Sequence, residues 1–195
     1  DPSSWELYNA GNTDGLVTKG YYGGCLDGRY MYYAPFSNGG DTFHGNVLRF
    51  DTQAEGSFSS PGNWSAHDAS SVDELSTVGY KGAAFDGRYV FFVPFRDALG
   101  HQHSRVLRYD TMADFDSTDA WNAMEVPDID DLPTQGYVGA EFDGRHVYFI
   151  PYQQDNSPYG VYHARVLRYD TRAAFKNRAS WSAFDAGTID GLKTK

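Results

Sequence analysis

The sequence predicts an all-β protein made of repeated four-stranded antiparallel units, arranged like the blades of a β-propeller. Two observations carry this prediction. A phrase of sixteen residues occurs three times, at 20–35, 79–94 and 136–151. Four tryptophans, Trp5, Trp64, Trp121 and Trp181, recur at spacings of 59, 57 and 60 residues. A fixed period of this size indicates a repeat architecture and takes precedence over any local pattern.

Each copy of the phrase predicts a β-hairpin. In the second copy the apolar runs 80–85 and 89–93 meet at Asp86-Gly87, and an Asp-Gly pair between apolar runs is the strongest short-range hairpin signal. We expect the Asp side chain to bond the turn backbone. Residues 90–93 are apolar on both strand faces, whereas a strand with one solvated face alternates. Each small sheet is therefore predicted to lie between two neighbours.

Two further strands complete each unit. In the second unit they are 106–110 and the segment beginning at Trp121, joined by a link (111–115) that is too short for a packed helix. The full chain, 1–195, reads as a single repeat domain with repeats at 20–78, 79–135 and 136–195. Residues 1–19 form an extra outer-strand segment, because 5–19 is nearly the same phrase as 181–195.

These units resemble β-propeller repeats of a loosely kelch-like kind, with an apolar strand pair, an aromatic-Asp strand and a Trp on the outermost strand. Kelch blades usually carry a double Gly after the second strand, whereas Gly23-Gly24 lies in the first strand of one repeat. A closed propeller has four to eight blades, so we expect a homo-oligomer or a part of a longer repeat array. A β-trefoil is the alternative, but its repeats are usually shorter and it has no use for a fourth Trp segment.

Composition limits the partners. The hydrophobic share of 41% with 16% aromatic residues is that of a globular protein. A net charge of −10 argues against nucleic acid and anionic membranes, and no run is long and apolar enough for a membrane span. A single cysteine, Cys25, excludes an internal disulfide and a Cys-based metal site. The Tyr-, Asn-, Ser- and Gly-rich composition favours an extracellular or secreted protein.

The repeats align into columns, and three columns predict a binding face. They are the Tyr that opens the first strand, the aromatic residue that follows the second strand, and the His before the third strand. In a propeller these positions share one face, where aromatic and His side chains would bind a glycan or a protein. The candidate ligand-binding residues are Tyr21, Tyr80, Tyr137, His44, His103, His163, Phe36, Phe95 and Tyr152. The alternative for the His column is structural, each His capping its own strand or bonding a loop carbonyl. A metal site is the least favoured reading.

Two charged columns are expected to be structural. Arg and Asp two residues apart on the third strand share a face and would lie side by side between blades. These structural pairs are Arg49 with Asp51, Arg108 with Asp110, and Arg168 with Asp170. A second Asp column occurs nine residues after each Trp, at Asp14, Asp73, Asp130 and Asp190. We expect Asx turns there and no cofactor, although Ca²⁺ is the cation that such oxygens would suit.

Known nucleophile, zinc-protease and phosphate-loop motifs are missing from the sequence, and no catalytic residue is assigned. The leading hypothesis is a non-enzymatic binding or assembly module that recognises a glycan or another protein. One rival is a carbohydrate-active enzyme, a glycoside hydrolase or lyase, with acids in a central channel. The acids that do not repeat are Asp97, Glu125, Glu141 and Asp155. The other rival is a structural protein whose repeats tile into a ring or a fibre.

Overall fold

The computed structural model describes residues 2–154, 161–187 and 189–191, and it shows an all-β chain with three four-stranded antiparallel sheets. We call the sheets blades 1, 2 and 3. Blade 1 contains β3 (Tyr21–Leu26), β4 (Tyr30–Pro35), β5 (Asn46–Asp51) and β6 (Trp64–Asp68). Blade 2 contains β9 (Tyr80–Phe85), β10 (Tyr89–Pro94), β11 (Arg105–Asp110) and β12 (Trp121–Glu125). Blade 3 contains β13 (Tyr137–Phe142), β14 (His146–Pro151), β15 (Arg165–Asp170) and β16 (Trp181–Asp185).

The predicted repeat of four-stranded antiparallel units is confirmed. Within each blade the strands pair in chain order, from the first strand of the unit to the Trp strand. The predicted strand boundaries hold to within one residue for the hairpin of blade 2. The turn of this hairpin is built as expected, because Asp86 Oδ1 accepts hydrogen bonds from the backbone N–H of Arg88 and Tyr89.

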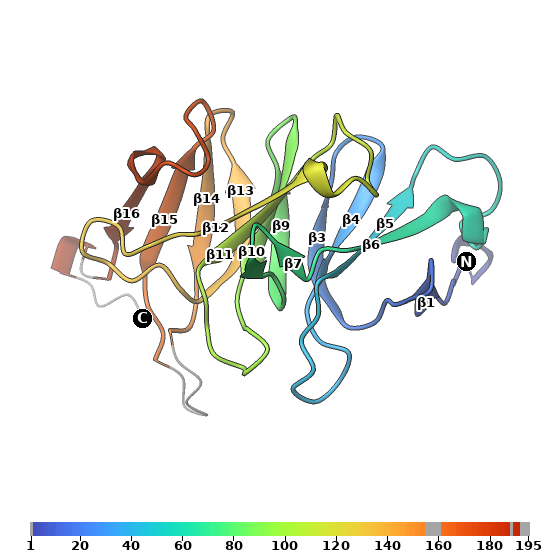
Figure 1. Cartoon of the computed structure of the whole chain (residues 1–195), viewed down its shortest axis with the longest axis horizontal. Coiled ribbons are helices and arrows are strands. Elements are labelled where there is room, and N and C mark those ends of the chain that lie inside the picture. Colours follow the sequence, from blue (N-terminus) through green and yellow to red (C-terminus); the bar gives the residue numbers. More distant parts are fainter. Residues whose placement is uncertain (1, 155–160, 188, 192–195) are drawn as a thin grey trace.

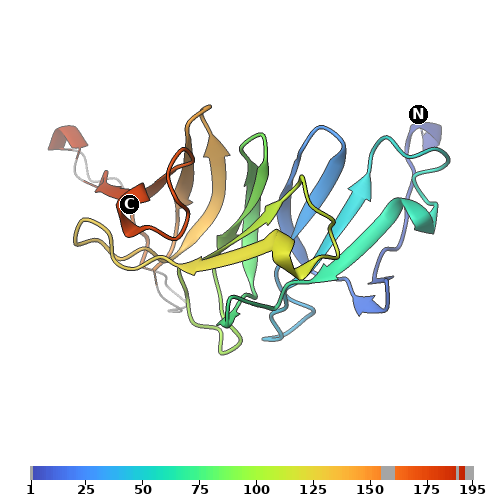
Figure 2. The same ribbon diagram turned by 45° about the horizontal axis from the view of Figure 1, so that its top comes forward.

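The first strands of the three blades lie against one another at the centre, and the blades fan out from them (Figure 1). Figure 2 shows the three sheets standing side by side. The approach of these inner strands needs glycine. A Cβ on Gly82 would lie 3.1 Å from the Cα of Gly139, and a Cβ on Gly23 would lie 3.2 Å from the Cα of Gly82. Both Gly23 and Gly82 also have a positive φ, which glycine adopts at low cost.

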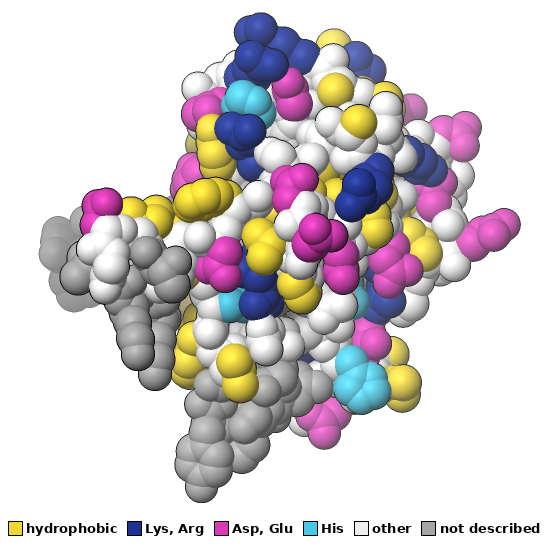
Figure 3. All heavy atoms as spheres, turned by 90° about the vertical axis from the view of Figure 1, so that its left-hand side faces the viewer, with side chains coloured by type: hydrophobic (Ala, Val, Ile, Leu, Met, Phe, Trp, Pro, Cys, Tyr) yellow, Lys and Arg dark blue, Asp and Glu magenta, His cyan; other side chains and the backbone are white. Residues whose placement is uncertain are grey.

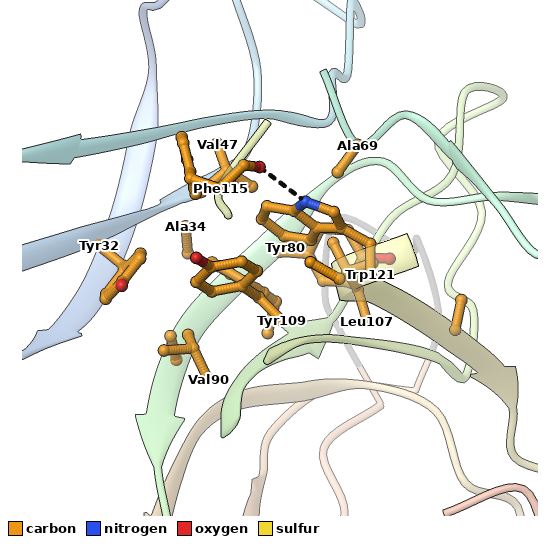
Figure 4. Close-up of a cluster of buried hydrophobic side chains, with 14 residues drawn as sticks. Tyr32, Ala34, Val47, Ala69, Tyr80, Val90, Leu107, Tyr109, Phe115 and Trp121 are labelled. Carbon is orange, nitrogen blue, oxygen red and sulfur yellow. Dashed lines mark hydrogen bonds between the residues drawn. The ribbon is translucent and has the colours of Figure 1, made fainter. Parts of the chain in front are cut away.

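Each junction between blades is filled by aromatic side chains. Between blades 1 and 2, Tyr32 packs against Tyr109 and Phe115, with ring centroids 5.8 and 6.3 Å apart (Figure 4). The Trp121 indole N–H donates to the carbonyl of Phe115, which explains the recurring six-residue spacing from Phe to Trp. Single 3₁₀ turns precede all three Trp strands of the blades, at Pro61–Asn63, Thr118–Ala120 and Arg178–Ser180. The junction cores are thus the reason why both faces of the central strands are apolar.

A small hairpin follows the first and second Trp segments and packs against the outer strand of the next blade. The hairpins are β1 (Asn12–Thr13) with β2 (Leu16–Val17), and β7 (Ser71–Val72) with β8 (Leu75–Ser76). At the third position only the bridge from Ile129 to Leu132 forms. The carboxylate of Asp73, at the hairpin tip, accepts a hydrogen bond from the backbone N–H of Ala123 in blade 2. This link between consecutive blades was not predicted from the sequence.

The segment that precedes β1 lies at the outer edge of blade 1. Trp5 and Leu7 are 84% and 94% exposed, whereas Tyr8 stacks on Trp64 with ring centroids 5.3 Å apart. In the part of the chain that is described, no helix has the length and apolar character needed to cross a membrane. The predicted third repeat includes residues 192–195, which lie outside the described residues.

Candidate functional site

The repeating His and Tyr columns lie inside the blades. The His103 Nδ1 accepts a hydrogen bond from the backbone N–H of Arg105, so Nε2 carries the proton and donates to the carbonyl of Val78, 2.9 Å away. The Tyr80 ring meets His103 edge-on at 5.8 Å, and its hydroxyl donates to the carbonyl of Arg105. Blades 1 and 3 repeat the His geometry, with His44 bound to the carbonyl of Lys19 and His163 bound to the carbonyl of Gly136.

Burial keeps these side chains from a ligand at the surface. Tyr80 and Tyr137 are 0% exposed, and His44 and His103 are almost completely buried. Tyr21 and His163 are half-buried in the same arrangement. Desolvation lowers the pKa of all three histidines, and that of His103 to about 4, so their rings are neutral at pH 7. The His column therefore connects strands to the preceding link, as in its structural reading, and the predicted binding face is corrected to exclude these six residues.

The third predicted column does gather at one end of the inner strands. Phe36 and Phe95 have ring centroids 6.2 Å apart, and Phe95 and Tyr152 have ring centroids 6.3 Å apart. Tyr22, from the inner strand β3, extends this group, and its ring centroid lies 6.0 Å from that of Phe36. We call these four side chains the aromatic row. Tyr22 and Tyr152 are 48% and 38% exposed, so the row reaches the surface at both ends.

Glycine at the start of each inner strand positions the aromatic row. The carbonyl of Gly79 accepts hydrogen bonds from the backbone N–H groups of both Phe95 and Arg96. A Cβ on Gly79 would lie 1.8 Å from the carbonyl oxygen of Arg96, and its φ is +74°. Gly20 and Gly136 make the equivalent bonds in blades 1 and 3. The glycine that opens each repeat thus fixes the position of the loop that follows the second strand, through backbone hydrogen bonds.

The ammonium group of Lys81 lies inside the aromatic row. Its Nζ is 3.9 Å from the Phe95 ring centroid, 4.6 Å from that of Tyr22 and 5.0 Å from that of Phe36. The pKa of Lys81 is lowered, first by burial and then by the nearby Arg96 guanidinium. Aromatic ring faces attract a cation, and the attraction grows as the cation loses water.

Arg96 adds a second cation beside the row. Its Cζ lies 5.4 Å from the Phe95 ring centroid, and its Nε is buried without a hydrogen-bond partner among the described residues. None of the ion pairs formed within the described ranges involves Lys81 or Arg96. In a chain of net charge −10, two adjacent cations without a carboxylate partner in the described ranges mark this end of the inner strands as the candidate site.

The predicted Arg–Asp pairs have other partners. The carboxylate of Asp51 is bound by the turn residue Arg29, with an Nη2–Oδ2 distance of 2.6 Å, and Arg29 holds the pKa of Asp51 below its usual range. Asp110 and Asp170 are bound in the same way by the turn arginines Arg88 and Arg145.

The strand arginines instead carry contacts between blades. The Arg49 guanidinium lies 4.1 Å from the ring centroid of Phe115 in blade 2, and Arg108 lies 4.2 Å from that of Phe175 in blade 3. Arg168, the third member of this column, bonds Ser182 within its own blade. The arginines and carboxylates of this column thus have different partners, because the hairpin turn, not the neighbouring strand position, brings a guanidinium to the carboxylate.

The acids that do not repeat lie apart. Asp97 and Glu125 each lie 3.8 Å from Arg105, near the end of the blade that carries the aromatic row. Glu141 lines a groove at the opposite end of the inner strands, beside Cys25. Burial, with Asp27 and Glu141 nearby, raises the pKa of the Cys25 thiol to about 12. Asp155 lies outside the described residues.

The second Asp column connects consecutive blades. The carboxylates of Asp14, Asp73 and Asp130 accept the backbone N–H of Ala66, Ala123 and Ala183 in the blade that follows. These three residues and Asp190 have φ between 51° and 53°, the left-handed conformation that Asp tolerates better than most residues. Among the residues that the structure describes, no three His, Cys, Asp or Glu side chains are grouped so that they could hold a metal ion.

The residues that complete the site depart from the repeat. Lys81 stands where the other repeats have Tyr22 and Val138, and Arg96 stands where they have Ser37 and Gln153. Departure from a column is thus the signal that could have identified both cations from sequence. A scan of protein-family models and a search of curated proteins gave no match to this chain.

Proposed function

We propose that this protein is a non-enzymatic binding module that recognises a glycan through the aromatic row and its two cations. The observation that carries the proposal is the position of Lys81 among four aromatic rings, with Arg96 beside it and no carboxylate partner for either among the residues that the structure describes. We also propose that the blades are of a loosely kelch-like kind, and that the protein acts outside the cell, where glycans are abundant.

The chemistry of the row suits a sugar. Exposed Tyr22 and Tyr152 combine a flat apolar ring with a hydroxyl that can donate and accept hydrogen bonds. The exposed rings of Tyr22 and Tyr152 offer apolar surfaces to the C–H faces of sugar residues, whereas Phe95 is 1% exposed and packs between Phe36 and Tyr152. Binding sites of this kind combine aromatic walls with a few polar groups that fix the orientation of the ligand.

The two cations favour a glycan that carries a carboxylate. A guanidinium binds a carboxylate through paired hydrogen bonds, and an ammonium binds it as a point charge. The buried Arg96 Nε, which lacks a partner among the described residues, would gain one from such a ligand. A neutral glycan would leave both charges without a partner and bind more weakly.

The test is a glycan array that contains neutral and uronic or sialic acid glycans, followed by calorimetry on any that bind. We expect binding to acidic glycans, and we expect Tyr152→Ala and Lys81→Gln each to weaken it roughly tenfold. The affinity of the unmodified protein should fall with added salt, and the Lys81→Gln variant should show a smaller salt dependence.

Trp5→Ala is the matched control, because Trp5 is an exposed aromatic residue outside the row. It should bind like the unmodified protein. Absence of binding to every glycan at high protein concentration would contradict the proposal, as would equal losses in the Trp5→Ala and Tyr152→Ala variants. Binding to a protein ligand that depends on the same row would redirect it to protein recognition.

A further inference from the structure

None of the described residues forms a blade against the face of blade 3 that corresponds to the covered faces of blades 1 and 2. We call the face that each blade turns toward the next blade in the chain its back face, and the opposite face its front face. On the back faces of blades 1 and 2, Tyr32 and Phe91 are 1% and 0% exposed, because the following blade covers them. Phe91 packs against Tyr169 and Phe175 of blade 3, as Tyr32 packs against Tyr109 and Phe115 of blade 2.

The back face of blade 3 carries the same kinds of side chain without this cover. Ile150 is 46% exposed, whereas its equivalents Ala34 and Val93 are both 0% exposed. Phe184, on the outer strand, is 61% exposed. A hollow of about 480 Å³ lies on this face, lined by Tyr148, Val166, Arg168, Ser182, Ala183 and Phe184. Figure 3 views the molecule from the blade 3 side and shows hydrophobic side chains interspersed with charged ones.

The arginine column shows what kind of surface would cover this face. Arg49 and Arg108 each lie over a Phe ring that the next blade supplies, Phe115 and Phe175 respectively. Arg168 occupies the same position in blade 3 and is exposed. A surface that covers this face should therefore present an aromatic ring to Arg168, as the front face of a blade does.

The chain has one front face that is only partly covered, and it belongs to blade 1. Phe50 and Phe58 are half-buried there, whereas their equivalents in blade 2, Tyr109 and Phe115, are 1% and 3% exposed. The difference arises because blade 1 is covered only by the N-terminal segment, through Tyr8, Ala10 and Leu16. Blade 1 therefore carries the ring, Phe58, that corresponds to the partners of Arg49 and Arg108.

We propose that the back face of blade 3 binds the front face of blade 1 of a second copy of this chain. Arg168 would then lie over Phe58 of the second copy, and Tyr148 would pack against Phe50 and Phe58. The contact joins two different surfaces, so its repetition gives a ring if the rotation closes and a filament if it does not.

The N-terminal segment of the second copy, which covers part of its blade 1 front face, must be displaced for this contact to form. The residues three positions after Trp5 and Trp64 stack on the Trp of the next blade: Tyr8 on Trp64, and His67 on Trp121 with ring centroids 4.8 Å apart. Phe184 holds this position in β16 and would compete with Tyr8 of the second copy for Trp64. Displacing residues 5–8 would break the stacking of Tyr8 on Trp64 and the hydrogen bond from Ser57 to Glu6, whereas Trp5 and Leu7 are almost fully exposed and would lose little.

The test measures molecular mass by light scattering and sedimentation at about 1 to 300 µM protein, a range that covers weak specific contacts. We expect the mass of the unmodified chain to rise with concentration. Phe184→Asp on the back face and Phe58→Ala on the front face should each lower the association constant at least roughly tenfold. Met112→Asp is the control, since Met112 is 80% exposed in the turn after β11 and should leave association unchanged.

Mixing the two variants distinguishes the proposed contact from a symmetric one. The Phe184→Asp chain keeps an intact front face and the Phe58→Ala chain keeps an intact back face, so the mixture should form a pair that neither chain forms alone. A circular dichroism melt establishes that each variant is folded; Arg168→Glu, at an exposed position, replaces a back-face variant that is not, and Phe58→Leu replaces a front-face variant that is not. A monomeric unmodified chain at the highest concentration would overturn the proposal. Association that survives Phe58→Ala but not Phe184→Asp would also overturn it, in favour of two blade 3 faces that pair with each other.

Discussion

Blades 2 and 3 differ little in sequence and much in surroundings. Their third strands share the sequence Val-Leu-Arg-Tyr-Asp, yet Val106 is 0% exposed while Val166 is half-buried. Arg108 lies on a ring of the following blade, whereas Arg168 is exposed. The Val and Arg of this strand thus lie in a junction in blade 2 and at the surface in blade 3, while the Leu and Tyr are buried in both blades. In a repeat protein the neighbours of a unit, as well as its own sequence, decide what is buried.

The largest expected effect compares equivalent positions on the two back faces. Phe91→Ala should lower the free energy of unfolding by about 3 to 5 kcal/mol, because it removes a fully buried ring from the junction of blades 2 and 3. Tyr148→Ala should cost about 1 kcal/mol or less in dilute protein, because Tyr148 is only half-buried and its hydroxyl bonds the exposed Asp143. Urea denaturation of both variants gives the two values.

Measuring both stability costs at several protein concentrations tests whether a second copy covers the back face of blade 3. If a second copy covers the back face of blade 3, the cost of Tyr148→Ala should grow as the protein is concentrated, while that of Phe91→Ala should stay the same. Equal costs for the two variants in dilute protein would show that blade 3 does not have the open face described here.

A smaller effect, which depends on pH, comes from the buried His of blade 2. Burial lowers the pKa of His103 to about 4 from its ordinary value of 6.5. The unfolded chain therefore binds a proton between pH 6.5 and 4 that the folded chain does not, and the stability contribution of neutral His103 is lost as pH falls through this window. The loss is on the order of 3 kcal/mol.

Denaturation at several pH values between 7 and 4 tests this sign. In the His103→Gln variant, stability should fall less steeply with decreasing pH than in the unmodified protein, although the variant is less stable at pH 7. His101→Gln, at an exposed position two residues away, should keep the steep dependence. A His103→Gln profile parallel to that of the unmodified protein would mean that His103 does not titrate in this window.

The smallest expected effect is a gain in stability at the hairpin that connects blades 1 and 2. Glu74 has a φ of 64°, a conformation that costs a residue with a Cβ more than glycine, and the equivalent residues in the first and last hairpin segments are Gly15 and Gly191. Glu74→Gly should therefore raise the free energy of unfolding by about 0.5 to 1 kcal/mol. Thermal denaturation measures it, with Glu55→Gly as a control at an exposed position without positive φ. A loss of stability in Glu74→Gly as large as in Glu55→Gly would refute the argument from φ.

Much of the fold could be predicted because its signals are local and occur three times. The Asp-Gly turn and the adjacent apolar runs predicted the hairpin, and the recurring Trp that follows a Phe predicted the outer strand. The two-residue strands of β7 and β8 could not be predicted, because a hairpin of this size has no periodicity to detect. The partner of Asp51 was missed because the pairing register of two strands, not their spacing in sequence, brings Arg29 to it.

One column of the candidate site was proposed from the sequence. The Phe36, Phe95 and Tyr152 column was identified from its place in the repeat, and the structure brings its members together. The Tyr and His columns occupy the same end of the blades, but their side chains point into the blade. The sequence does not show this direction, because it depends on hydrogen bonds to backbone groups at the start of the third strand and in the link before the first. Lys81 and Arg96 were missed because the candidate residues were taken from columns that repeat in all three units, and these two residues each occur in one unit only.

The glycine that opens each inner strand has a consequence for how the proposed binding surface can diversify. Because Gly20, Gly79 and Gly136 anchor the three loops through backbone groups alone, the side chains and lengths of these loops are free to change one repeat at a time. The loops leave the same end of the three sheets, as the lower part of Figure 1 shows. A new specificity can therefore arise in a single loop while the scaffold, and the other two loops, keep their geometry.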